Sequence, residues 1–91
     1  MEFINNATKS KYVIQDGTIK WYDTKKDKLQ EIIFIDRIDW LWILSDKSAF
    51  MLINKLELHF GNQQVDIIAE SYEQAHQMAD VILEEKKKLQ N

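Results

Sequence analysis

The spacing of apolar residues changes once along the chain, near residue 70, and this change constrains the fold more than any other feature. Before that point, short apolar runs alternate with polar residues, which is typical of β-strands. In "SYEQAHQMADVILEEKKKLQN" the apolar residues recur at intervals of three and four, which is typical of an amphipathic helix. The sequence therefore predicts an α+β protein: a series of strands, then one C-terminal amphipathic helix over residues 71–90.

Both glycines of the chain lie where tight turns are expected. Asp16-Gly17 separates "KYVIQ" from "TIKWYD" and predicts a hairpin with a type I′ turn. Gly61-Asn62 separates "LELHF" from "QQVDIIA" and favours a second tight hairpin, of type II′. The break at Asn54-Lys55 is weak, so the fifth and sixth strands are alternatively one bent strand. Seven strands are predicted in all: 11–15, 18–22, 29–35, 38–44, 50–54, 56–60 and 64–69.

The two ends of the chain are expected to differ in order. Ser71, with Gln74 three residues later, has the form of a helix capping box, and the lysines at 86–88 complement the helix dipole. Residues 1–9 precede the first predicted strand, and we expect them to be flexible. Because no proline and no low-complexity tract forms a linker, residues 1–91 are expected to be a single domain.

The composition argues against several classes of protein. The chain has no cysteine, so it has neither a disulfide framework nor a thiolate metal site. Its net charge of −3 lacks the basic footprint that is typical of proteins that bind nucleic acid or anionic membranes. There is no signal-peptide pattern and no apolar stretch long enough to span a bilayer, so we expect a cytoplasmic protein.

The series from "KYVIQDGTIKWYD" through "LELHFGNQQVDIIA" into "SYEQAHQMADVILEE" resembles the pleckstrin-homology-like (PH-like) superfold, in a small bacterial or phage form. The resemblance implies about seven antiparallel strands in a bent, partly open barrel that the C-terminal helix caps. Eukaryotic lipid-binding members carry basic residues around an extended first hairpin loop and a tryptophan in the helix. Here the first predicted turn is the short Asp16-Gly17 and no tryptophan follows Trp42, so the resemblance implies the fold and not phosphoinositide binding.

No motif in the chain predicts catalysis. His59 is expected to point outward from its strand and His76 lies beside the apolar side of the helix, and neither has a second ligand at metal-site spacing. Asp36, Asp39 and Asp46 occur at strand ends and turns, where aspartate favours hydrogen bonds to the backbone. Both glycines are used in turns, so there is no phosphate-binding loop. We expect no enzymatic activity, no cofactor, no metal and no small-molecule substrate.

The stretch "RIDWLWIL" contains two tryptophans, Trp40 and Trp42, that share one face of a strand. The neighbouring strands are apolar on both faces, so one helix cannot cover the whole central sheet. Either strand curvature buries the tryptophans, or they form an exposed apolar patch of the kind that marks protein interfaces. The second interpretation predicts a contact surface of Trp40, Trp42, Phe34 and Met51, with Asp39 in its polar rim.

Three functions are compatible with these features. The first is a small non-catalytic module that uses the apolar face to bind a protein partner or a second copy of itself, for example as a homodimer. The second is a peripheral binder of lipid or other anionic surfaces that uses Lys20, Lys25, Lys26 and Lys28. The third is a small acidic inhibitor of phage type, in which carboxylates such as Asp39 occupy a nucleic-acid site of a host enzyme. Binding of nucleic acid itself and insertion into a membrane are not expected.

Overall fold

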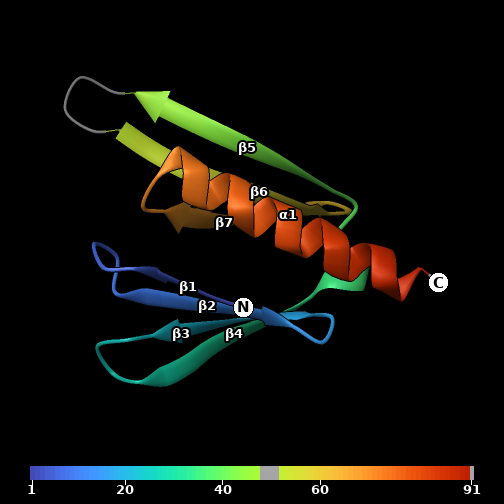
Figure 1. Ribbon diagram of the computed structural model, residues 1–91, viewed down its shortest axis with the longest axis horizontal. Helices are drawn as coiled ribbons and strands as arrows, with labels where there is room; N and C mark the ends of the chain where they lie inside the picture. Colours follow the sequence, from blue (N-terminus) through green and yellow to red (C-terminus); the bar gives the residue numbers. More distant parts are fainter. Residues whose placement is uncertain (48–51, 91) are drawn as a thin grey trace.

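Two antiparallel sheets and a C-terminal helix make up the structure, a computed structural model that describes residues 1–47 and 52–90 (Figure 1). The first sheet has four strands in the order β1-β2-β3-β4, and the second has three in the order β5-β6-β7. This confirms the α+β class. Among the described residues no strand of one sheet pairs with a strand of the other, so a barrel is not confirmed. The elements are β1 (Glu2–Asn5), β2 (Ser10–Gln15), β3 (Thr18–Asp23), β4 (Lys28–Phe34), the 3-10 helix η1 (Ile35–Arg37), β5 (Trp40–Lys47), β6 (Leu52–Phe60), β7 (Gln63–Ala69) and α1 (Tyr72–Leu89).

The N-terminus forms strand β1 instead of the flexible segment expected over residues 1–9. β1 pairs with β2 from Glu2 opposite Val13 to Asn5 opposite Ser10. Its Phe3 side chain is buried in the core, and Asn5 is buried too, with its side-chain amide donating to the carbonyl of Ile68 in the other sheet at 2.9 Å. The strand has only four residues and buries a polar one, so the alternation of apolar and polar residues does not detect it.

The predicted fifth and sixth strands are one continuous strand, β6. Its pairing with β7 continues through the weak break, where Asn54 lies opposite Ala69 and Lys55 opposite Ile68. The alternative of a single strand is therefore confirmed. The first two positions of the predicted strand 50–54 lie outside the described residues.

The predicted Asp16-Gly17 turn and the helix start are confirmed, and Gly61, with a φ of +55°, lies in the expected two-residue turn between β6 and β7. Asp16 and Gly17 have φ values of +53° and +77°, as a type I′ turn requires. Ser71 caps α1 by accepting a hydrogen bond from the backbone N–H of Gln74 at 3.0 Å. The capping box is only half formed, because the Gln74 side chain turns away from Ser71. It accepts from the N–H of Glu70 and donates to the carbonyl of Ile4 in β1, which ties the start of the helix to the first sheet.

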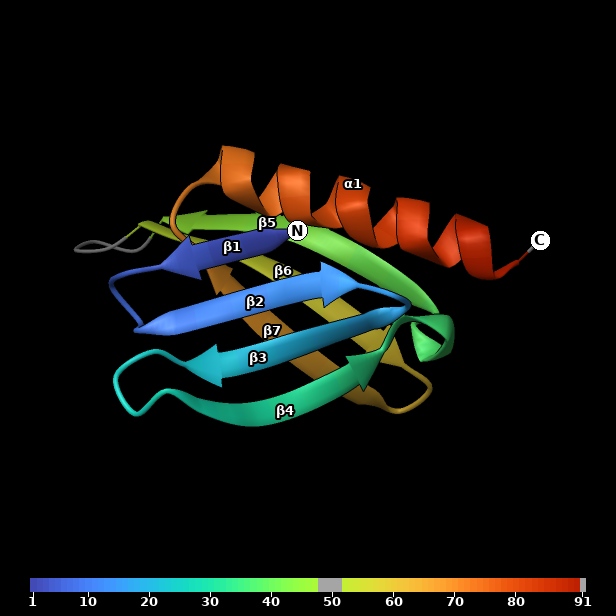
Figure 2. The same cartoon turned by 60° about the horizontal axis from the view of Figure 1, so that its bottom comes forward.

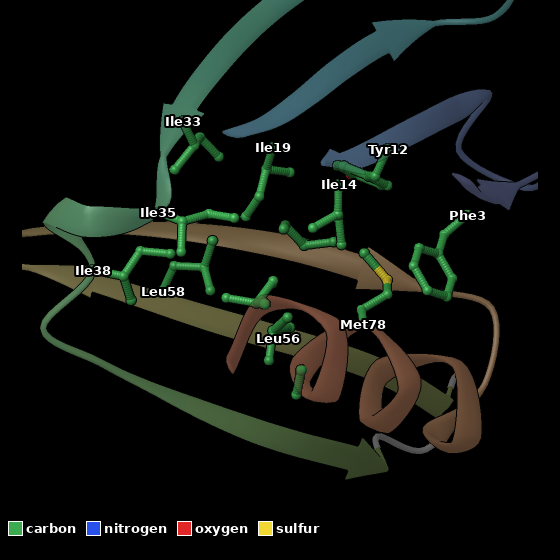
Figure 3. Packing of buried hydrophobic residues seen from close by; sticks show 13 residues of the cluster. Phe3, Tyr12, Ile14, Ile19, Ile33, Ile35, Ile38, Leu56, Leu58 and Met78 are labelled. Atoms are coloured by element: carbon green, nitrogen blue, oxygen red, sulfur yellow. The ribbon is translucent and has the colours of Figure 1, made fainter. Parts of the chain in front are cut away.

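The core lies between the inner faces of the two sheets and one side of α1. Figure 3 shows Ile14 and Ile19 of the first sheet pointing toward Leu56 and Leu58 of the second and toward Met78 of the helix. The helix packs against β2, η1, β5, β6 and β7, and in Figure 2 it runs along the side of the molecule where β1 and β5 lie. The helix therefore does not cover the outer face of either sheet.

Candidate contact surface

Trp40 and Trp42 lie side by side on the outer face of the three-stranded sheet. Their side chains are 45% and 54% exposed, whereas Leu41 between them points inward and packs against the core. The two indole rings have centroids 5.1 Å apart and are tilted by 56°. Strand curvature therefore does not bury the tryptophans. Of the two interpretations of "RIDWLWIL", the structure agrees with the exposed patch.

His59 completes an aromatic cluster with these rings. It lies directly opposite Trp40 in the pairing of β5 with β6, and its ring stacks on the Trp40 indole with centroids 3.5 Å apart and planes 3° apart. Trp42 lies opposite Glu57 and meets the imidazole at a tilt, at 6.4 Å. The expectation that His59 points outward is confirmed, because its neighbour Leu58 is fully buried. Cross-strand stacking thus holds Trp40 in a defined orientation.

A chain of charged and polar contacts orients the histidine. His59 Nε2 lies 3.2 Å from Glu57 Oε1, and the ammonium of Lys55 lies 3.2 Å from the other oxygen of that carboxylate. The same ammonium donates to Asp66 at 3.3 Å, and Gln64 donates to Asp66 at 2.7 Å. Hydrogen bonds to these two carboxylates raise the pKa of Lys55 above its ordinary value. We call this surface the aromatic face; its members are Trp40, Trp42, Lys55, Glu57, His59, Gln64 and Asp66.

Asp39 borders the aromatic face but has a structural task of its own. Its carboxylate accepts a hydrogen bond from the N–H of Gly61 at 2.6 Å, and its own N–H donates to the carbonyl of His59 at 2.8 Å. These bonds fasten the β6–β7 turn to the start of β5. Asp39 therefore supports the end of the aromatic face and keeps an exposed negative charge beside Trp40.

The structure separates Phe34 from the tryptophans, with which sequence reasoning had grouped it. Phe34 ends β4 in the other sheet, is 51% exposed, and has the Arg37 guanidinium 5.8 Å from its ring centroid. It lines a cleft between β4 and the β6–β7 hairpin together with Ile33 and Phe60. The reason is η1, which turns the chain between β4 and β5, so the two strands belong to different sheets. Met51, the remaining predicted member, lies outside the described residues.

The lysines predicted for an anionic surface divide into two groups. Lys25 and Lys26 lie in the β3–β4 turn, where the Asp23 carboxylate accepts hydrogen bonds from both of their N–H groups, at 2.9 and 3.2 Å. Lys28 starts β4 nearby, whereas Lys20 is half-buried in the middle of β3, opposite Val13 and Ile32. Sequence reasoning missed Lys9 because residues 1–9 were expected to be flexible. Its carbonyl accepts from Thr24 N–H at 2.9 Å, which brings the β1–β2 turn next to the β3–β4 turn.

No protein-family model, curated protein or solved structure matches the chain. Within residues 1–47 and 52–90, no group of three or more histidine and acidic side chains is placed to hold a metal ion. In the same part of the chain, no helix has both the length and the apolar character needed to cross a membrane.

Proposed function

We propose that this protein is a small non-catalytic interaction module whose contact surface for a protein partner is the aromatic face. The observation that carries the proposal is the exposure of two adjacent tryptophans, 45% and 54%, on a face whose polar members already hydrogen-bond to one another. Tryptophan is among the residues most enriched in binding hot spots, and an apolar centre with a charged border is typical of interfaces.

The energetics agree with this interpretation. A tryptophan buries up to about 250 Å² when it is fully covered, so covering the exposed half of each ring is worth about 2–3 kcal/mol. The Trp40 ring is already held by His59, so less side-chain entropy is lost on binding than for a mobile ring. Covering both rings therefore offers a gross gain of about 4–6 kcal/mol, which offsets part of the free-energy cost of association.

The test compares three proteins: the wild type, a Trp40→Ala/Trp42→Ala variant, and a Leu83→Ala variant as matched control. Leu83 is 50% exposed on α1 and belongs to no part of the aromatic face. Solution mass by light scattering over a wide concentration range reports self-association, and affinity capture reports other partners. Only the double variant is expected to show a lower solution mass or to fail to capture its partner. Its circular-dichroism spectrum is expected to stay unchanged. Equal behaviour of all three proteins would contradict the proposal.

We further propose that the fold is PH-like. Seven antiparallel strands followed by a C-terminal helix are the elements that the resemblance implies, and their presence in this order supports the proposal. The first hairpin loop is then the β1–β2 turn and not Asp16-Gly17, which joins β2 to β3. The proximity of Lys9 to the β3–β4 turn favours binding to an anionic surface as a second candidate function.

That second candidate is tested with vesicles that contain anionic lipid. A Lys25→Gln/Lys26→Gln/Lys28→Gln variant is compared with a variant that carries the same changes at Lys86, Lys87 and Lys88, at the end of α1. Both variants lose three positive charges, so only the location differs. Salt-sensitive sedimentation that the turn variant loses and the helix variant keeps supports the candidate; equal loss in both would reduce it to an effect of net charge.

A further inference from the structure

We propose that the partner of the aromatic face is cationic: an arginine- or lysine-bearing protein segment that lays a guanidinium or ammonium group over the Trp42 ring. This inference rests on the proposed function and names the chemistry of the partner. It follows from the ring geometry, the balance of charge across the face and the spacing of the carboxylates.

The ring geometry leaves Trp42 as the more open platform. The parallel imidazole of His59, 3.5 Å away, covers one side of the Trp40 indole. Trp42 meets both rings only at a tilt and is 54% exposed, the largest exposure of an aromatic ring in this cluster. Indole is the aromatic ring that attracts cations most strongly, through the negative face of its quadrupole.

The charge of the face points to the same partner. The carboxylates of Glu57 and Asp66 share the single ammonium of Lys55, so the three residues together keep one negative charge in excess. Asp39 adds another at the edge. An approaching cation therefore meets attraction from the ring and from the carboxylates, whereas an anionic surface meets repulsion.

A guanidinium group fits this arrangement best. Glu57 lies directly opposite Trp42 in the strand pairing, so a cation stacked on that ring lies near a carboxylate, although both oxygens of this carboxylate already contact His59 and Lys55. Arginine has a planar guanidinium that stacks on aromatic rings and is more weakly hydrated than an ammonium group, so it loses less hydration when it covers the indole. A second copy docking by the same face would instead oppose like charges across a twofold axis.

The experiment follows the indole N–H signals of ¹⁵N-labelled protein by NMR. The chain has three tryptophans, and the third, Trp21, has a buried indole nitrogen and packs against the core from the four-stranded sheet, so it serves as an internal reference. The probes are acetylated hexa-arginine, hexa-lysine and hexa-glutamate peptides. We expect the Trp40 and Trp42 signals to shift with hexa-arginine and more weakly with hexa-lysine, while the Trp21 signal stays in place and hexa-glutamate has no effect.

Three variants give the inference its sharpest test. Trp42→Ala is expected to weaken hexa-arginine binding about tenfold. Lys55→Gln releases both carboxylates and is expected to tighten binding severalfold, which damage to the fold would not do. Lys88→Gln makes the same change of net charge on α1, beside Glu85, and is expected to leave binding unchanged.

Three results would overturn the inference. If Lys55→Gln and Lys88→Gln tighten hexa-arginine binding equally, the gain comes from net charge and not from the aromatic face. If the Trp40 and Trp42 indole signals shift with protein concentration in the absence of peptide, the aromatic face binds a second copy of the chain. If no cationic peptide moves the two signals while the Trp40→Ala/Trp42→Ala variant still loses its partner, the partner is not cationic and the proposed function stands without this inference.

Discussion

The two sheets differ in how their outer faces hold exposed apolar side chains: Ile32 and Phe34 lie two residues apart on β4 of the four-stranded sheet, whereas on the three-stranded sheet two indole rings and the His59 ring contact one another. Ile4 and Leu29 are both 45% exposed, but Lys11 and Tyr22 separate them in the strand pairing, and the Lys11 ammonium lies 4.9 Å from the Tyr22 ring centroid. Trp42, in contrast, touches a ring cluster that a chain of hydrogen bonds holds in place. Exposure alone is common on protein surfaces, so the organisation of the exposed groups is what distinguishes the aromatic face.

The largest expected effect is on the free energy of unfolding, and it compares the inner and outer faces of the three-stranded sheet. Leu58→Ala empties a site that is fully buried between the sheets, and we expect it to lower the free energy of unfolding by about 3 kcal/mol. Trp42→Ala removes a larger side chain from the outer face and is expected to cost about 1 kcal/mol, mainly its contact with Trp40. Urea denaturation of both variants measures the difference. Similar losses would mean that Trp42 is part of the core in solution.

The elements that local spacing controls were predictable from the sequence. Alternation and turn residues predicted β2, β3, β4 and β7 to within about a residue at most ends, and the helical spacing predicted α1. β1 could not be predicted because its anchoring is long-range: Asn5 bonds to Ile68, and the Met1 amino group donates to the carbonyl of Ile14. A strand of four residues whose stability comes from such contacts leaves little local pattern.

The candidate site was predictable only in part, for a related reason. Alternation within a strand placed Trp40 and Trp42 on one face and turned His59 outward. The stacking of His59 on Trp40 depends on the register between β5 and β6, which the spacing within one strand does not contain. Phe34 was grouped with the tryptophans because the turn η1 was not foreseen, so two sheets were treated as one.

An intermediate effect tests whether the stacked arrangement holds the aromatic face. His59→Ala removes the ring that covers Trp40 and the contact with Glu57, and we expect a loss of about 1 kcal/mol in stability. The indole signal of Trp40 should also move, since its stacked neighbour is gone. His76→Ala is the matched control, because it removes an edge-on contact with Tyr72 on α1. A Trp40 signal that responds equally to both changes would contradict the stacked arrangement.

A smaller effect on stability is expected at Phe34, and this residue tests whether the four-stranded sheet belongs to the contact surface. Phe34→Ser is expected to change the free energy of unfolding by less than about 1 kcal/mol, because the ring is half exposed and its main charged neighbour is Arg37. It should leave solution mass and partner capture unchanged, whereas Trp42→Ser should reduce one of them. If Phe34→Ser reduces capture as much as Trp42→Ser, both sheets take part in one contact surface, and the distinction between the two faces is wrong.

The smallest effect concerns the hydrogen-bonded chain beside the rings. Hydrogen bonds to Glu57 and Asp66 raise the pKa of Lys55 above 10.5, its value in an unfolded chain, so protonated Lys55 stabilises the fold. This contribution is fully present below pH 10.5 and is lost as the pH rises through the folded-state pKa. The difference in unfolding free energy between the wild type and Lys55→Gln should therefore shrink over that range, while groups common to both proteins cancel. It is expected to be small because water reaches the exposed Asp66 carboxylate and screens its attraction to the ammonium. A difference that does not change with pH would mean that Lys55 makes no ion pair in solution, and that ring stacking alone orders the aromatic face.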